Sequence, residues 1–206
     1  MAHVIDESAA HAGLRVVRGA ELRATPWRNG GGTTREIAAH PPGAGFDDFV
    51  WRVSAADVER SGPFSRFAGI DRMLVLLAGA GMHLVDGRGV AHAALDEPFA
   101  FARFPGELAL TADLIDGPTR DLNIMLRRDR VRSTSELWHG AGAHLLDADA
   151  VVIFCAHDTL EVTIAGAQPV RLDAMDALQI DAPSRLPCIV AGHGTAIAVG
   201  LCCFET

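Results

Sequence analysis

The sequence has 206 residues, a formal net charge of −8, 49% hydrophobic residues and 21% charged residues. This length and composition predict one compact domain or two small fused halves rather than a disordered chain. Because a protein that grips phosphate backbones needs a basic face, the acidic balance argues against direct nucleic-acid binding. The sequence also lacks lysine, which excludes Schiff-base chemistry and a P-loop.

The N-terminal residues, the most apolar stretch and the cysteines indicate where the protein is located in the cell and whether it is cross-linked. Residues 1–13 have neither the basic start nor the apolar run of a signal peptide. The most apolar stretch, residues 189–204, is too short and too interrupted to span a bilayer. We therefore expect a cytoplasmic protein without a membrane partner. No CxxC motif is present, so we expect neither a disulfide nor structural zinc at Cys155, Cys188, Cys202 and Cys203.

Short strands separated by turn residues dominate the pattern and predict an all-β fold. An N-terminal group of strands is expected at Arg15–Val17, Thr33–Ala38 and Val50–Ala55. A first set follows at Met73–Ala78, Gly81–Val85, Pro98–Phe104, Leu108–Ile115 and Asp121–Leu126. A second set follows at Ala150–Cys155, Thr159–Ile164, Ala177–Ile180, Ile189–Ala191 and Thr195–Leu201. Between the two sets, Ser135–Leu146 has a weak helical pattern.

The two sets of strands resemble each other at an offset of about 78 residues, where MLVLLAGAGMHLV lies over VVIFCAHDTLEVTI. Such self-similarity indicates duplication of one β unit, although any two antiparallel sheets share some apolar pattern. Antiparallel chains hide their edges by closing barrels or stacking jelly rolls. We therefore expect two units, residues 1–130 with the polar segments described below and residues 131–206, packed as one compact body.

The first polar segment, PWRNGGGTTREI at residues 26–37, joins three glycines to an alternating strand. Glycines allow close approach of another group, and the missing GK[ST] excludes a phosphate loop. Trp27 and the strand after the loop favour a shaped loop over a flexible surface turn. Thr34 and Glu36 share one face of the strand, which is predicted to be a polar lining.

The second polar segment covers residues 49–72. Arg52 and Ser54 project to one side of their strand, and the apolar residues between them project to the other. This pattern fits a polar pocket lining and fits ordinary alternation with Arg52 in solvent equally well. The loop GPFSRFAG presents Ser65 and Arg66, but without GxSxG it does not indicate a nucleophile elbow.

The third polar segment is LIDGPTRDLNIM at residues 114–125, where Asp121 and Asn123 share one face of a strand. Inside a barrel these groups need hydrogen bonds to each other, to water or to a ligand. On an outer face they would be solvated. Histidines with metal-ligand spacing are missing, since His83 stands alone in GMHLVDG, so we expect no metal and no other cofactor.

These three segments, in this order, resemble the signature segments of the HutD/Ves family. The resemblance covers residues 14–130 closely and the rest in pattern only. It implies a double-stranded β-helix (cupin or jelly-roll) fold with two fused cupin units, a bicupin. It also implies a bacterial cytoplasmic protein that regulates or modulates histidine utilisation by binding an acidic intermediate similar to formylglutamate or urocanate.

Carried onto this chain, the resemblance makes ten residues of the three segments candidates for ligand binding and assigns no catalytic residue. Arg52 is the first choice to pair with a ligand carboxylate, because its planar fork matches that group. Glu36 and Asp121 would accept an N–H from the ligand or hold Arg52 in place. The ten candidates are Trp27, Asn29, Thr34, Glu36, Arg52, Ser54, Ser65, Arg66, Asp121 and Asn123.

Three functions remain open from the sequence. The preferred one is a metal-independent protein that binds a small acidic metabolite, is not an enzyme, and is compatible with a homodimer. A metal-free cupin isomerase or hydrolase acting on the same acids is the second, and it would need a carboxylate or His83 to transfer protons. A module that binds a pathway enzyme through an exposed barrel face is the third.

Overall fold

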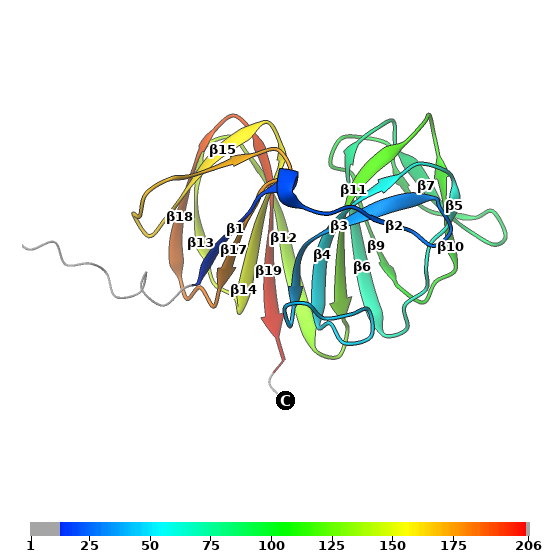
Figure 1. Cartoon of the computed structure of the whole chain (residues 1–206), viewed down its shortest axis with the longest axis horizontal. Coiled ribbons are helices and arrows are strands. Elements are labelled where there is room, and N and C mark those ends of the chain that lie inside the picture. The colour runs from blue at the N-terminus through cyan, green and yellow to red at the C-terminus, as the bar shows by residue number, and fades with distance from the viewer. Residues whose placement is uncertain (1–12, 205–206) are drawn as a thin grey trace, which may run out of the picture. The chain divides into compact units, whose positions relative to one another are not determined.

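The computed structural model describes residues 13–204, which form strands joined by turns and one short 3-10 helix, η1 (Gly19–Glu21) (Figure 1). The expectation that the chain starts without a signal peptide concerns mainly residues 1–12, which lie outside the described part. Within residues 13–204, no helix has the length and apolar character needed to cross a bilayer.

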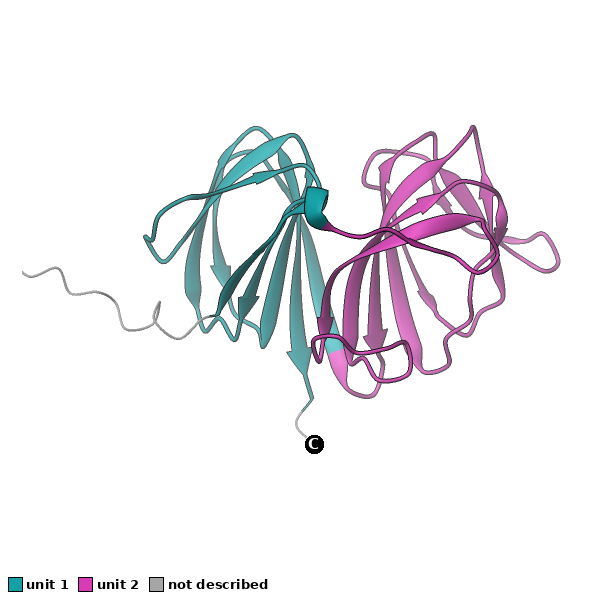
Figure 2. Cartoon of the chain, viewed as in Figure 1, with its two compact units in different colours: residues 1–21, 132–206 teal, residues 22–131 magenta. Residues whose placement is uncertain are grey.

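The chain divides into two compact units (Figure 2). Unit 2 is Leu22–Val131, and unit 1 combines the segment up to Glu21 with Arg132 onward. The boundary expected at residues 130 and 131 is thus close, but the expectation that the N-terminal segment belongs to the first unit is wrong. The reason is β1 (Leu14–Val17), which pairs antiparallel with β17 (Ala177–Asp181) of unit 1. Packing of the units as one body stays a prediction.

Unit 2 consists of two sheets. The six-stranded sheet has the order β2-β3-β4-β11-β6-β9, with β2 (Thr25–Pro26), β3 (Gly32–His40), β4 (Trp51–Val58), β11 (Thr119–Arg127), β6 (Ile70–Ala78) and β9 (Phe101–Pro105). The four-stranded sheet has the order β5-β10-β7-β8, with β5 (Gly62–Pro63), β10 (Leu110–Leu114), β7 (Met82–Asp86) and β8 (Ala91–Leu95).

Unit 1 also consists of two sheets. The five-stranded sheet has the order β1-β17-β14-β19-β12, with β14 (Ala150–His157), β19 (Thr195–Cys203) and β12 (Val131–His139) completing it. The four-stranded sheet has the order β13-β18-β15-β16, with β13 (Gly142–Leu146), β18 (Leu186–Gly192), β15 (Thr159–Ile164) and β16 (Val170–Asp173).

The two units repeat one eight-strand pattern, because β4 to β11 and β12 to β19 occur in the same order within their sheets. The repeated order is consistent with the predicted duplication, but the register expected from the sequence needs a correction. Both pairs of central strands contain an irregularity, between Arg120 and Asp121 in unit 2 and between Cys155 and His157 in unit 1. Matching these positions places Leu76 on Cys155, an offset of 79. An offset of 78 would exchange the two faces of the strand.

In each unit the core lies between the two sheets. The core cluster of unit 2 takes Leu74 and Leu76 from the six-stranded sheet and Met82 and Leu84 from the four-stranded sheet. The core cluster of unit 1 likewise takes residues from both of its sheets. Facing sheets that bury their inner side chains are typical of jelly-roll barrels.

The helical pattern expected at Ser135–Leu146 is wrong, because this segment lies in β12 and β13. Gly140 adopts a positive φ of 66° between the two strands, a turn conformation that glycine adopts without strain. Across the turn, the rings of Trp138 and His144 stack with centroids 3.7 Å apart. The segment predicted to be helical therefore forms two strands that belong to different sheets of unit 1.

Candidate functional site

Unit 2 has a row of polar side chains on the inward face of its six-stranded sheet, which we call the inner polar row: Arg52, Ser54, Arg72, Asp121 and Asn123. Each of them is at most 8% exposed. The pairing of β11 with β4 sets Asn123 opposite Ser54, and the pairing of β11 with β6 sets Met125 opposite Arg72. Three strands that are distant in sequence therefore bring these groups together.

The direction of the row follows from strand alternation. Arg72 lies between Ile70 and Leu74 on one face of β6, and both of these belong to core clusters of unit 2. Side chains two residues apart share a face. The inner polar row therefore faces the core of unit 2. Of the two arrangements that the sequence leaves open, the structure has the one with Arg52 and Ser54 in the interior and not the one with Arg52 in solvent.

Arg52 is held by neighbours on both sides. Its Nε donates to Glu36 Oε2 at 2.8 Å, and its Nη1 donates to Ser54 Oγ at 3.3 Å. The Phe46 ring covers the guanidinium, with its centroid 4.9 Å from Cζ. The Arg52 side chain is 10% exposed but that of Glu36 is 41% exposed, so the ion pair joins the interior to the surface.

Arg72 is the residue of this cluster that the sequence reasoning missed. Its guanidinium carbon lies 4.9 Å from the ring centroid of Phe64 and 5.3 Å from that of Phe104. Its Nε donates to Asn123 Oδ1 over a long 3.4 Å. Burial lowers its pKa to about 10, the charge of Asp121 acts to raise it, and the charge of Arg52 acts to lower it. Its alternation with Ile70 and Leu74 is the sequence signal that identifies it.

Asp121 occupies the other end of the row. Burial raises the pKa of its carboxyl to about 7, against the opposing effect of Arg72, and the nearby charge of Asp57 raises it further. Asp121 Oδ2 has no hydrogen-bond partner in the described part of the chain, and the same holds for Thr119 Oγ1. Near neutral pH the row therefore combines two arginines with a carboxyl that is only partly ionised, which leaves the interior with excess positive charge.

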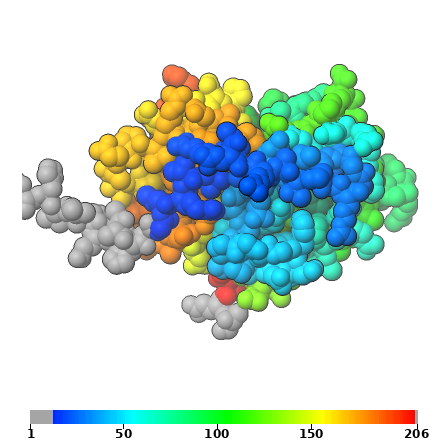
Figure 3. Space-filling view, viewed as in Figure 1, coloured from blue at the N-terminus to red at the C-terminus, as the bar shows by residue number. Residues whose placement is uncertain are grey.

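The glycine-rich loop is shaped, as its sequence predicts. Gly30 has φ +65°, and a Cβ at Gly32 would lie 2.2 Å from the Asp57 carbonyl oxygen of the neighbouring strand. Trp27 Nε1 donates to Thr34 Oγ1 at 2.7 Å, which links the loop to β3. The segment just before this loop is exposed, and Figure 3 shows it in blue on the molecular surface.

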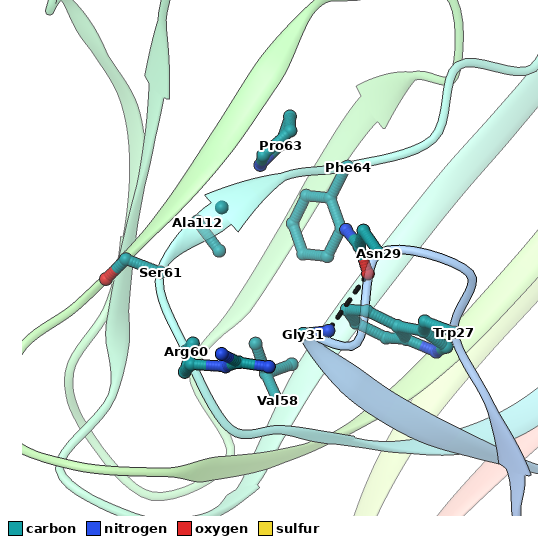
Figure 4. Close-up of a pocket in the computed structure, with 10 residues that line it drawn as sticks. Trp27, Asn29, Gly31, Val58, Arg60, Ser61, Pro63, Phe64 and Ala112 are labelled. Atoms are coloured by element: carbon teal, nitrogen blue, oxygen red, sulfur yellow. Dashed lines mark hydrogen bonds between the residues drawn. The ribbon is translucent and has the colours of Figure 1, made fainter.

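A pocket of 220 Å³ opens beside this loop (Figure 4). Trp27 and Phe64 line it with rings whose centroids are 6.4 Å apart in an edge arrangement. Arg60 also lines it and donates from Nη2 to the Gly30 carbonyl oxygen. Because Phe64 both lines the pocket and contacts Arg72, its ring stands between the pocket and the inner polar row.

The remaining candidates from the sequence lie outside the row. Asn29 is exposed, lines the pocket and accepts from the Gly31 amide at 3.0 Å. Ser65 and Arg66 are exposed, and Arg66 Nε donates to the Glu107 carbonyl oxygen at 3.0 Å. The structure therefore gathers Arg52, Ser54, Asp121 and Asn123 in the interior, with Glu36, Thr34, Trp27 and Asn29 along its margin, and leaves Ser65 and Arg66 on the surface.

His83 does not join this site. His83 lies on β7 between Met82 and Leu84, which are core residues, so its side chain projects to the opposite face. Over residues 13–204, no group of three or more histidine, cysteine, aspartate or glutamate side chains is arranged to hold a metal ion.

Two jelly-roll barrels with the same strand order, one of which encloses a polar row, define a cupin-type protein with two fused units. Comparisons with known proteins agree with this class and identify the family. The HutD family model matches residues 19–198, and the chain belongs to the HutD family. A 21.2 kDa Pseudomonas putida protein named for the hutC 3′ region is 36% identical over 174 residues, which are 84% of this chain and 90% of the relative.

Further relatives and solved structures agree. Protein Ves of Citrobacter koseri is 41% identical over 109 residues, 52% of this chain and 54% of the relative. HutD from Pseudomonas fluorescens SBW25 has a TM-score of 0.80 at 33% identity, covering 94% of this chain and all of that one. The structure of a conserved Pseudomonas aeruginosa PAO1 protein has a TM-score of 0.84 at 34% identity. It covers 92% of this chain and 99% of that one. Oxalate decarboxylase of Bacillus subtilis, at 9% identity and a TM-score of 0.59, shares the fold alone.

Proposed function

We propose that this protein binds a small acidic metabolite in the interior of unit 2, without a metal, and thereby regulates or modulates histidine utilisation. The single observation that carries the proposal is the pair of buried arginines, Arg52 and Arg72, in one barrel interior. Burying a guanidinium is costly unless an anion compensates it, and Glu36 compensates only Arg52. A ligand carboxylate would supply the missing negative charge and match the planar fork.

The choice of acid rests on the relatives. The Pseudomonas putida relative is named for the hutC 3′ region, and the Pseudomonas fluorescens relative is called HutD. We therefore propose an acid from histidine degradation, similar to formylglutamate or urocanate. The pocket beside Phe64 is the proposed route by which the acid reaches Arg72. The cytoplasmic location and the homodimer expected from the sequence stay predictions.

A thermal-unfolding screen of the full chain tests this function. Urocanate, formiminoglutamate and formylglutamate would be added at millimolar concentrations, because a ligand at about 100 times its Kd stabilises the folded state by about 2.7 kcal/mol. We expect at least one acid to raise the unfolding temperature of the natural protein but not that of Arg52→Met. If none of the acids stabilises the natural protein, the proposal fails.

A metal-free enzyme acting on the same acids is the second candidate, and one observation favours it. The Asp121 carboxyl, with a pKa raised by burial to about 7, is suited to give or take a proton near neutral pH. Turnover of any of the three acids that is abolished by Asp121→Asn, with binding retained, would establish this candidate. Binding without turnover would leave the first proposal standing alone.

A further inference from the structure

One end of the inner polar row offers hydrogen-bonding capacity that the described protein does not use. Thr119 and Asp121 are 3% and 1% exposed, and Thr119 Oγ1 and Asp121 Oδ2 both lack a partner among residues 13–204. The two residues stand two apart on β11, opposite Val58 and Ala56 of β4. They therefore share the inward face of the sheet.

Buried polar atoms without partners are rare in native proteins, because each loses its hydrogen bonds to water without replacement. The jelly-roll fold does not require them here. At the matching position of unit 1, Asp121 is replaced by Ala196, which is fully buried in the apolar core. The buried carboxyl of Asp121 is thus not required by the architecture.

Arg72 lies on the same inward face, where its Nε donates to Asn123 Oδ1 at 3.4 Å. Its charge acts on Asp121, yet no ion pair between the two groups forms in the described part of the chain. The Arg72 guanidinium supplies N–H donors, the Thr119 hydroxyl can donate or accept, and the Asp121 carboxyl can accept when ionised. A ligand that enters the row therefore needs an acceptor for Arg72 and a donor for Asp121 or Thr119.

We propose that Thr119 and Asp121 form a specificity subsite for a group that carries an N–H donor, such as an amide or an imidazole. This inference rests on the proposed function and narrows it. The ligand class is an acid whose carboxylate pairs with the buried arginines Arg52 and Arg72 and whose other end carries such a group. Acids without an N–H leave Thr119 and Asp121 unpaired and bind more weakly.

Calorimetric titration of the full chain with two matched acids tests the subsite. Urocanate carries an imidazole N–H, and 3-(2-furyl)acrylate has a similar shape with a ring that lacks it. We expect the natural protein to prefer urocanate by roughly tenfold or more, because sites built to hydrogen-bond a group reject analogues that lack it. In Thr119→Val and in Asp121→Leu the preference should fall to about threefold or less.

A control comes from the other unit. Thr195 is a buried threonine at the start of β19, so Thr195→Val removes a hydroxyl at a comparable depth and should leave the preference unchanged. Thr119→Val keeps the side-chain shape, so it tests the subsite even where Asp121→Leu fails to fold. Equal binding of the two acids to the natural protein, or a preference retained in a folded variant, overturns the subsite while leaving the proposed function intact. Binding of neither acid, nor of formylglutamate, overturns both.

Discussion

The interiors of the two units differ although their strands follow the same order. When the irregularities of the central strands are matched, Arg72, Asp121 and Asn123 of unit 2 correspond to residues of unit 1 that are apolar and at most 6% exposed, namely Val151, Ala196 and Ala198. Unit 1 therefore shows that this barrel closes around an apolar core. The architecture therefore does not require the polar row of unit 2, which supports the proposed binding site.

The buried aspartates of the two units also differ in their hydrogen bonds. In unit 1, Asp176 accepts hydrogen bonds from Arg18 Nη1 at 2.6 Å and from the Gly19 amide at 2.8 Å, and so holds the N-terminal segment. In unit 2, Asp121 Oδ2 accepts none from the described residues. One carboxylate is a structural link, whereas the other has an oxygen without a partner among the described residues.

The largest expected effect concerns the arginines. Arg52→Met and Arg72→Met should each weaken binding of the acid by about 3 kcal/mol, roughly 100-fold, because a buried charge pair with the ligand is lost. Calorimetric titration measures this change. Arg18→Met, which removes an arginine of unit 1, should leave the affinity unchanged. Equal losses of affinity in all three variants would show that the acid does not bind at Arg52 and Arg72.

The two aspartates should respond in opposite ways to removal of their charge. Asp176→Asn should lower the free energy of unfolding by about 3 kcal/mol, because Arg18 and the Gly19 amide lose a charged acceptor. Asp121→Asn should leave stability unchanged or raise it, because it removes a poorly solvated carboxyl. Thermal unfolding of both variants at pH 7.5 makes the comparison, and a larger loss in Asp121→Asn would contradict it.

The pH dependence of stability should follow from Asp121. Its pKa in the folded state is raised from 3.8 to about 7, so the folded state binds more protons than the unfolded state between these values. Stability from this group is therefore full below about pH 4 and falls as the pH rises towards 7. Between pH 5 and pH 7 the natural protein should lose roughly 2 kcal/mol relative to Asp121→Asn. Parallel stability curves for the two proteins would show that the carboxyl titrates normally.

The smallest expected effect concerns Phe64, whose ring stands between the open pocket and Arg72. Phe64→Ala should speed association of the acid severalfold and change its equilibrium affinity little, because the ring blocks the route more than it holds the ligand. Stopped-flow fluorescence of Trp27, which lines the pocket, follows the rate. Phe101→Ala, at a ring that is 64% exposed, is the matched control and should leave the rate unchanged.

Strand alternation in the sequence was enough to place Arg52 with Ser54 and Asp121 with Asn123. It could not show that β4 and β11 are neighbours, because pairing between distant strands is set by the whole fold. Arg72 was missed because the strand expected at Met73–Ala78 begins three residues earlier, at Ile70, in the structure. Because Arg72 is charged, the apolar pattern of Ile70 and Leu74 did not predict that it faces inward with them.

The positions of loop residues and the register of the repeat were harder to predict from the sequence. Ser65 and Arg66 were expected in the pocket, but a loop has no fixed alternation, and both lie on the surface. The repeat was found at an offset one residue short, because the apolar patterns of the strands match almost equally well in both registers. Only the irregularities in strand pairing, which involve His157 and Arg120, fix the register.

A crystal structure of the protein with formylglutamate or urocanate tests the central claim most directly. The account predicts a carboxylate within about 3 Å of the Arg52 or Arg72 guanidinium nitrogens, inside unit 2, and an apolar interior of unit 1 without ligand. An acid bound on the surface or in unit 1, with both arginines unchanged in their present contacts, would contradict it.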